Sequence, residues 1–285
     1  MTLSRPGGAG SQSDNRKVTD ICIPRTGEMR IDAHVHGDIT KLEESPQEYA
    51  ACCQELGIER IGLIEDPDDA FPAQKALPDF VIPIVRVDID TVTVEQIHEH
   101  FDAGAPAVKF INPRFSYGDT RYDPLYAAIS DRSKVAVFHT GYLGRSFGVP
   151  SRPTDITLMR PAAIDCLSRR HPDLKIIMAH YGNPWWEEAW KITWSTPNVY
   201  ADMGGGTAFI RSLVMWREML APNGKLDEAS LAKLMFASDV KYFNGEPEVG
   251  SYFEFYDELL DLVGAPEELR ERVNRGNAMT LFGLE

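Results

Sequence analysis

The sequence has little cysteine, and its few cysteines are not spaced as in a disulfide framework or a zinc module. Cys22, Cys52, Cys53 and Cys166 are the only four in 285 residues, and none stands in a CxxC motif. This pattern argues against a small disulfide-stapled domain and against a cysteine-rich structural zinc site. We therefore predict free thiols and a reducing location, the cytoplasm.

Long apolar runs and a surplus of basic charge are also missing. No stretch approaches the about 20 apolar residues that cross a membrane, and the N-terminus lacks the apolar segment of a signal peptide. Lysine and arginine number 29 against 43 aspartates and glutamates, so the formal net charge is -14. Because nucleic-acid binding needs basic residues to neutralise phosphates, we predict a small-molecule substrate and neither a nucleic acid nor a membrane as partner. A homo-oligomer stays an open expectation, since no sequence feature marks an interface.

A GxGxxG motif after the first apolar run is missing as well, which argues against a dinucleotide-binding fold. The chain instead alternates short apolar, β-branched runs with amphipathic stretches of helical period. The predicted strands are 30–36, 60–65, 81–88, 107–111, 135–139, 175–180, 199–202 and 234–239. The predicted helices include 45–56, 92–103, 124–130, 157–170, 185–192 and 207–220, with 250–262 and 266–284 as C-terminal closing helices. This order predicts an α/β fold, a (β/α)8 TIM barrel over 28–285, preceded by a flexible extension or lead-in strand over 1–27.

Two histidines at the end of the first predicted strand are the most informative residues. His34 and His36 stand in Met29-Arg-Ile-Asp-Ala-His-Val-His-Gly37. In a strand, residues i and i+2 point to the same face, so both imidazoles project together. Imidazole is the commonest protein ligand of divalent metals, so the pair predicts part of a metal site that needs further ligands.

Polar or ionisable residues end the other predicted strands. They are Glu65, Asp88, Lys109, His139, His180, Asp202 and Asp239. Catalytic groups of such barrels come from the carboxyl ends of several strands, so these side chains would converge with His34 and His36 at one mouth. A single histidine after an apolar run is usually a core residue. Four of them, with an aspartate that ends the last strand, indicate a metal site.

Three other histidines receive no role. His98 and His100 repeat the HxH spacing, but they lie in the predicted helix 92–103. Residues two apart on a helix are separated by about 200° around its axis, so these two cannot share an ion. His171 lies in a helix-to-strand turn at the opposite face of the barrel.

At these motifs the sequence resembles the amidohydrolase superfamily and, within it, the amidohydrolase-2 group of TIM-barrel enzymes, which includes the aminocarboxymuconate-semialdehyde decarboxylases. The matching pieces are Ile-Asp-Ala-His34-Val-His36, Phe-His139-Thr-Gly, Ala-His180-Tyr-Gly, Ala-Ser-Asp239 and the C-terminal Asn277-Ala-Met-Thr-Leu-Phe-Gly-Leu284. The resemblance implies that His34, His36, His139 and Asp239 ligate one divalent metal, most often zinc, with manganese as an alternative. It also implies that His180 polarises the substrate or shuttles protons beside the metal, and that Asp239 accepts the proton of the metal-bound water.

Lys109 leaves the number of metals open. In the binuclear branch of the superfamily, a lysine at the end of the fourth strand is carboxylated and bridges two metals, and Lys109 stands at about that place. A buried unmodified lysine could instead bind a carboxylate of the substrate. We favour one metal, and we expect two if Lys109 is carboxylated.

The ligand set is consistent with more than one reaction. A divalent metal lowers the pKa of a bound water, so that hydroxide can attack an ester, lactone or amide, and this hydrolase activity is the prediction. The alternative is a metal-dependent decarboxylase of a small aromatic or unsaturated acid. A metal-free lactonase-like or ligand-binding barrel is the second alternative, and the acidic net charge argues against a deoxyribonuclease.

Loop residues would select the substrate. The candidates are Arg114, Tyr117, Arg145, Trp185 with its neighbour Trp186, and Tyr242. The two arginines would suit an anionic substrate through bidentate pairing, and a tryptophan could wall a planar one. Together they predict a small, carboxylated substrate.

Overall fold

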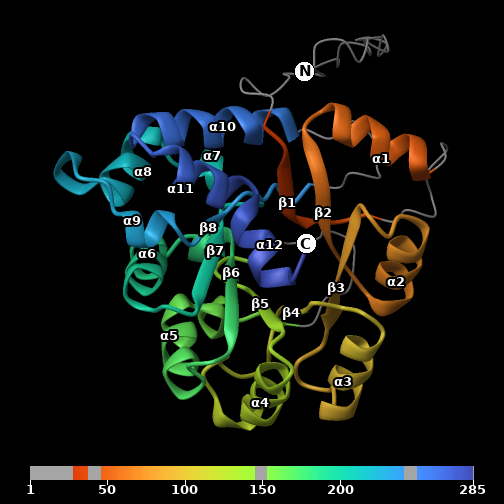
Figure 1. Cartoon of the computed structure of the whole chain (residues 1–285). Coiled ribbons are helices and arrows are strands. Elements are labelled where there is room, and N and C mark those ends of the chain that lie inside the picture. The colour runs from red at the N-terminus through yellow and green to blue at the C-terminus, as the bar shows by residue number, and fades with distance from the viewer. Residues whose placement is uncertain (1–27, 38–45, 145–152, 241–248, 285) are drawn as a thin grey trace, which may run out of the picture.

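The computed structural model describes residues 28–37, 46–144, 153–240 and 249–284. Eight parallel strands run in the order β1 to β8 and form a nearly closed barrel with helices around it (Figure 1). The strands are β1 (Arg30–Val35), β2 (Ile58–Glu65), β3 (Val81–Val87), β4 (Ala107–Phe110), β5 (Val135–His139), β6 (Lys175–Ala179), β7 (Val199–Asp202) and β8 (Leu234–Met235). The predicted (β/α)8 fold is confirmed. The predicted extension over 1–27 lies outside the described residues.

Backbone hydrogen bonds close the barrel between β1 and the segment that follows β8. The amide of Ala33 donates to Phe236 O (3.1 Å), the amide of Asp239 to His34 O (2.7 Å), and the amide of His36 to Val240 O (3.0 Å). The segment that carries Asp239 is therefore tied directly to the strand that carries the two histidines.

Helices cover the outside of the barrel. They are α1 (Pro46–Glu55), α2 (Pro67–Ala76), α3 (Val94–Asp102), α4 (Asp123–Asp131), α5 (Pro161–Arg170), α6 (Trp186–Ser195), α7 (Thr207–Ile210), α8 (Leu213–Leu220), α9 (Glu228–Leu231), α10 (Val249–Leu262), α11 (Glu267–Glu271) and α12 (Asn277–Phe282). None of the described helices is long and apolar enough to cross a membrane. Cys53 and Cys166, whose side chains are described, are free thiols.

Two hydrophobic clusters separate the interior of the barrel from its outer layer. The inner cluster is built from the early, inward-facing residues of the strands, among them Ile31, Ile82 and Val135. Ala278, Leu281 and Phe282 of α12 belong to this same cluster, and α12 lies across the ring of strands in Figure 1. The C-terminal helix therefore plugs the amino-terminal end of the barrel, and the cavity lies at the carboxyl ends of the strands.

Several predicted boundaries were wrong for local reasons. The predicted helix 157–170 begins only at Pro161, after a 3-10 turn over Ile156–Met159, because proline suits the first helical position. The predicted helix 207–220 is two helices, since Ser212 accepts a hydrogen bond from the amide of Met215 and starts α8. The predicted helix 266–284 is interrupted by a π-helical turn over Arg272–Gly276, and α2 was not among the helices named from the sequence.

Candidate metal centre

A β-bulge in β1 turns His34 and His36 toward the mouth of the barrel. Between Asp32 and Val35 this strand advances three residues while its partner β2 advances two. Ile31, before the bulge, packs in the inner cluster, whereas Val35, after it, packs in the outer one. Strict alternation from Ile31 would have sent both histidines outward. Their shared face follows from the i, i+2 spacing, but its direction is set by the bulge.

Gly62 of β2 makes room for the bulge. A Cβ on Gly62 would lie 2.5 Å from the carbonyl oxygen of Ala33 and 2.9 Å from its carbonyl carbon, closer than side-chain carbons approach other atoms. Only glycine lets the bulged backbone come this close. The aim of the two histidines therefore depends on a residue of the neighbouring strand.

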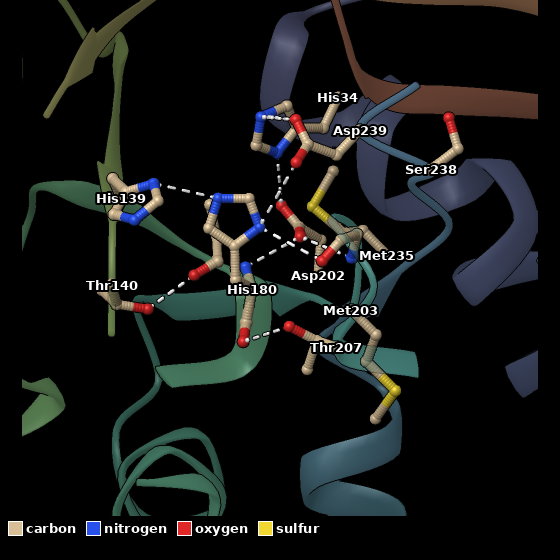
Figure 2. A network of polar contacts seen from close by, with 12 residues as sticks. His34, His139, Thr140, His180, Asp202, Met203, Thr207, Met235, Ser238 and Asp239 are labelled. Carbon is tan, nitrogen blue, oxygen red and sulfur yellow. Dashed lines mark hydrogen bonds and ion pairs between the residues drawn. The ribbon is translucent and has the colours of Figure 1, made fainter. Parts of the chain in front are cut away.

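Both imidazoles meet the same carboxylate. Oδ1 of Asp239 lies 3.2 Å from Nε2 of His34 and 3.1 Å from Nε2 of His36. Figure 2 shows the Asp239 carboxylate beside the ring of His34. Ligand atoms that share one Zn²⁺ at about 2.1 Å in tetrahedral geometry lie about 3.4 Å apart, so this spacing fits a common ion. Burial raises the pKa of Asp239, but the three histidines around it outweigh that effect and hold its pKa well below the usual range.

The contacts of Nδ1 in His34 and His36 show where the lone pair on Nε2 of each ring points. Nδ1 of His34 donates to Oδ2 of Asp202 (3.2 Å), and Nδ1 of His36 donates to Ile64 O (2.8 Å). In the neutral ring Nε2 then carries a lone pair, and it faces the oxygen of Asp239. A cation between the two groups relieves their repulsion. The surroundings of His36 favour such positive charge, because burial lowers its pKa but hydrogen bonds to Asp239 and Glu65 outweigh burial and raise its pKa to about 9.

His139 and His180 face each other in the same manner. Nε2 of His180 lies 3.0 Å from Nδ1 of His139. The other nitrogen of each ring reaches a carbonyl, Gly204 O for His180 (3.1 Å) and Tyr142 O for His139 (3.3 Å). Carbonyls only accept, so two neutral rings turn lone pairs toward each other, and again a cation would satisfy both. Burial lowers the pKa of each ring, which keeps both neutral and able to ligate.

His180 lies close enough to Asp239 and His34 to share an ion with them, although it was predicted only to stand beside the metal. The ligand atoms of His34, His180 and Asp239 all lie within 4.8 Å of one another, and Nδ1 of His180 is 3.9 Å from Oδ2 of Asp239. The structure therefore brings all five residues of the predicted centre together. It makes His180 a candidate ligand as well as a candidate proton shuttle.

Two of these residues have backbones in the left-handed region. His180 has φ 65° and Asp239 has φ 61°, so each follows a strand that ends earlier than predicted, at Ala179 and Met235. Such a backbone costs about 1–3 kcal/mol in a residue other than glycine and persists only when neighbours hold it. Asp202 does this for His180, whose amide donates to its Oδ1 (3.0 Å) (Figure 2).

Asp32 and Ser238 hold the backbone at Asp239. The hydroxyl of Ser238 donates to Oδ2 of Asp32 (2.5 Å) and its amide to Oδ1 (3.0 Å). These bonds fix the turn that aims the Asp239 carboxylate into the mouth. Asp202 was predicted to lie at the mouth but was given no role, and Asp32 was not predicted at all, although both are fully buried acids. A buried carboxylate next to a ligand motif was the signal that could have found them.

A cavity of about 400 Å³ opens above the centre. Its lining includes His34, His36, Arg86, Lys109, His139, Tyr142, Asn183 and Asp239. Nζ of Lys109 is buried with no hydrogen-bond partner among the described residues. Burial lowers its pKa to about 8, against the opposing effect of Asp202 and Asp239. Imidazoles, a carboxylate, an ammonium and a reachable cavity thus share one site.

Sequence comparison decides the family. The model of the amidohydrolase family (Amidohydro_2) matches residues 31–284, almost the whole chain. This chain belongs to the amidohydrolase family. No curated protein sequence matches it significantly.

Solved structures of similar fold include both hydrolytic and decarboxylating relatives of this amidohydrolase. A protein from Pseudomonas putida assigned as a 2-pyrone-4,6-dicarboxylic acid hydrolase has 18% identity and a TM-score of 0.61, with 90% of this chain and 98% of that one covered. The 5-carboxyvanillate decarboxylase of Sphingomonas paucimobilis has 12% identity and a TM-score of 0.60, with 90% and 99% covered. A dihydroxybenzoic acid decarboxylase from Polaromonas with bound manganese and 2-nitroresorcinol has 13% identity and a TM-score of 0.59, with 90% and 97% covered. Identities this low show the common fold.

The described substrate candidates of the amidohydrolase do not line its cavity. Tyr117 is fully buried in the outer core and donates from its hydroxyl to Phe110 O (3.2 Å). Arg114 lines a separate hollow with Asp90, whose carboxylate accepts from the Arg114 amide (2.9 Å). Arg160 lies over the ring of Trp185 and Arg211 over the buried Trp186, so both tryptophans pack with loop arginines. Arg145 and Tyr242 lie outside the described residues.

Arg86 is the charged residue of the cavity lining that the sequence prediction missed. The predicted end of the third strand was Asp88, which is exposed and accepts from the amide of Asp90 (3.0 Å) in a turn. Ile82 and Ile84 face the inner cluster, so alternation along β3 carries Arg86 inward next. The alternation of inward-facing residues along the strand predicts the cavity residue of β3 better than the position of the last polar residue does.

The remaining histidines of the amidohydrolase have structural surroundings. His98 and His100 lie on α3 away from the cavity, and the ring of His100 is 6.3 Å from that of Phe71. His171 ends α5 and contacts Asp123 through Nε2 (3.0 Å). None of the three is near the centre, in line with the absence of a predicted role.

Proposed function

We propose that this amidohydrolase is a metal-dependent hydrolase that cleaves an ester, lactone or amide bond of a small molecule. The observation that carries the proposal is the set of imidazole and carboxylate groups that face one another at 3.0–3.2 Å, namely Asp239 with His34 and His36, and His139 with His180. A divalent ion is the species that such a donor set fits, and zinc is the first choice, with manganese as the alternative.

His34, His36, His139 and Asp239 would hold the ion, and His180 would stand beside it. The ion supplies Lewis acidity and a water of lowered pKa. Asp239 would accept the proton of the attacking water, because its carboxylate lines the cavity between the rings of His34 and His36. His180 is neutral and directs its Nδ1 proton to Gly204 O, so its Nε2 would have to take up a proton before the ring could donate a hydrogen bond to the substrate oxygen as negative charge develops there.

Decarboxylation is the second candidate for the same site. Two relatives of similar fold are named as decarboxylases of hydroxylated aromatic acids. In that reaction the same residues would orient the carboxylate of an aromatic or unsaturated acid, and a protonated side chain of the cavity would deliver a proton to the carbon that loses CO₂. A neutral ester, lactone or amide substrate has no such group to lose.

Metal content per chain tests the proposal directly. We expect about one equivalent of zinc or manganese by mass spectrometry in the purified protein, and loss of it in His34→Ala/Asp239→Ala. His180→Asn compared with His139→Asn shows which of the two rings is a ligand, since only the ligand variant loses metal. About two equivalents would mean that Lys109 is a carboxylated bridge. No metal, even after reconstitution, would contradict the proposal and favour a metal-free lactonase-like or binding barrel.

Turnover separates the two reactions. The metal-loaded protein is offered lactones, esters, amides and aromatic acids, with pH-stat detection of acid release and gas detection of CO₂. Acid release without CO₂ supports hydrolysis, and CO₂ release supports decarboxylation. We also propose a cytoplasmic location and a small molecule as the partner, supported by the free thiols and the net charge of -14.

A further inference from the structure

Lys109 and Arg86 lie side by side on the inner face of the barrel. In the ladder between β3 and β4, Arg86 is the direct partner of Lys109. Ile84 and Ala107, the preceding residues of the same parity in each strand, both pack in the inner cluster. Both cations line the one cavity at the mouth. Like charges at neighbouring positions of a sheet repel, so this pair is unfavourable unless an anion accompanies it.

Asp202 and Asp239 are the carboxylates whose charge acts on Lys109, and three of their four oxygens meet other polar groups at 3.0–3.2 Å. Oδ1 of Asp202 accepts from the amides of His180 and Gly204 (3.0 Å each), and Oδ2 accepts from His34 (3.2 Å). Oδ1 of Asp239 faces His34 and His36. These acids lend Lys109 long-range charge compensation but no hydrogen bond. The Lys109 ammonium is 97% buried, and its N–H donors are available to a molecule in the cavity. A buried charge without a hydrogen-bonded partner destabilises the protein, so a bound anion would be favourable.

Arg86 is placed differently from Lys109. Its Nε donates to Asp66 (3.0 Å) and its Nη2 lies 3.5 Å from Glu65, so two acids at the rim balance its charge and hold the guanidinium in place. About a third of its side chain is exposed (37%), at the open side of the cavity. Lys109 is therefore the inner cation, without a hydrogen-bond partner among the described residues, and Arg86 is the outer one with two acidic partners.

We infer that Lys109 and Arg86 form a carboxylate-binding pair, so that the substrate of the proposed reaction carries a carboxylate that Lys109 binds and Arg86 orients. The binding of a carboxylate by this pair does not depend on the proposed function. That the bound molecule is the substrate does rest on it. A monoanion matches the one buried ammonium that lacks a hydrogen-bond partner among the described residues, whereas a phosphate dianion would bring two charges to one buried donor group. The pair thus selects carboxylated over neutral substrates of the same shape.

A pair of isosteric probes tests the inference without knowledge of the substrate. The metal-loaded protein is titrated with 4-fluorobenzoate and with the neutral 4-fluorobenzamide, and binding is followed by fluorine NMR. We expect the anion to bind at least about tenfold more tightly than the amide, because hydrogen bonds to charged groups contribute about 1.5–3 kcal/mol. Lys109→Met should abolish the preference. Lys75→Met, the same change on the exposed side of α2, should leave it intact. Arg86→Gln should weaken the preference less than Lys109→Met.

Each other result overturns the inference. A preference for the anion that survives in Lys109→Met would mean that the metal alone binds the carboxylate. Equal binding of the two probes, no binding of either, or displacement of 4-fluorobenzoate by inorganic phosphate at lower concentration would also contradict it. A carbamate resonance on Lys109 in protein prepared with ¹³C-bicarbonate would make Lys109 a metal bridge. Metal content is measured on every variant, so loss of the metal, which would contradict the proposed function, is distinguished from loss of the anion preference with the metal retained.

Discussion

At the scale of the residue, Asp202 fixes the orientation and the tautomer of the His34 ring. Its carboxylate accepts from Nδ1 of His34 and from the amides of His180 and Gly204, so one buried acid orients the ring of His34 and holds the backbone of His180. Burial opposes its ionisation, but His34 and its other partners outweigh burial and hold the pKa of Asp202 well below the usual range. A carboxylate behind a ligating histidine fixes the tautomer and raises the basicity of the ligand.

We expect Asp202→Asn to weaken metal binding by about 10–100-fold and to leave the fold intact, because the amide can still accept from the two backbone amides. Competition with a chromophoric chelator measures the affinity, and circular dichroism checks the fold. Asp88→Asn, at an exposed turn on the neighbouring face, is the matched control. An Asp202→Asn protein that binds metal within twofold of the wild type would show that Asp202 does not position His34.

At the scale of the element, the bulge of β1 and Gly62 on the neighbouring strand β2 together set the direction of the two histidines. The bulge turns the histidines to the mouth, and Gly62 lets the Ala33 carbonyl approach the neighbouring strand. A methyl group at Gly62 would meet that carbonyl at 2.5 Å, and two strands held by a ladder on both sides have little room to separate.

We therefore predict that Gly62→Ala lowers the free energy of unfolding by about 1–3 kcal/mol, as overpacking does, and also reduces metal content. Urea unfolding and mass spectrometry give the two numbers. Gly144→Ala, where an added Cβ meets no atom of the described residues within 4 Å, should leave the free energy of unfolding unchanged. If Gly62→Ala keeps its full metal content, the bulge does not depend on the glycine.

A buried ion pair joins β1 to α10. Arg30 is fully buried between the rings of Phe236 (5.0 Å) and Phe253 (4.7 Å), and its Nη2 donates to Oδ1 of Asp257. Removal of one partner leaves an unpaired charge in the core. We expect Asp257→Leu to cost about 3–5 kcal/mol in urea unfolding.

The double variant Arg30→Met/Asp257→Leu tests whether the unpaired charge of Arg30 causes this loss of stability. It should be closer to the wild type than Asp257→Leu alone, because it removes both charges and fills their space with apolar groups. If the double variant loses as much stability as the sum of the single ones, the pair contributes through packing rather than charge.

At the scale of the whole molecule, the two ends of the barrel have separate tasks. The inner cluster and α12 close the amino-terminal end, and the carboxyl ends of the strands carry the centre and the cavity. Stability and chemistry are therefore divided between opposite faces, as is usual for this architecture.

The division predicts that Phe282→Ala lowers the free energy of unfolding by about 3–5 kcal/mol but leaves the metal content of the folded protein unchanged. Phe282 is 5% exposed within the inner cluster, far along the chain from every residue of the centre. Unfolding by denaturant and metal analysis of the folded fraction measure both effects. Metal loss from the folded Phe282→Ala protein would show that the plug also shapes the mouth.

The sequence by itself determined the barrel and the five residues of its centre. Strands and helices alternate with distinct apolar periods, and those periods depend only on local geometry. The polar residues at the strand ends, His34, His36, His139, His180 and Asp239, were visible for the same reason, since parallel strands bring their carboxyl ends to one mouth. The ligand roles of these residues stay a prediction.

Only the tertiary structure decided which way side chains face. The bulge that aims His34, the acceptor that Asp202 offers it and the register that sets Arg86 beside Lys109 all depend on contacts between strands distant in the chain. Tyr117 was predicted to reach the substrate, but its ring packs in the core layer beneath the helices. Local pattern places a residue on an element. Its direction and its neighbours are set by packing, which involves the whole barrel at once.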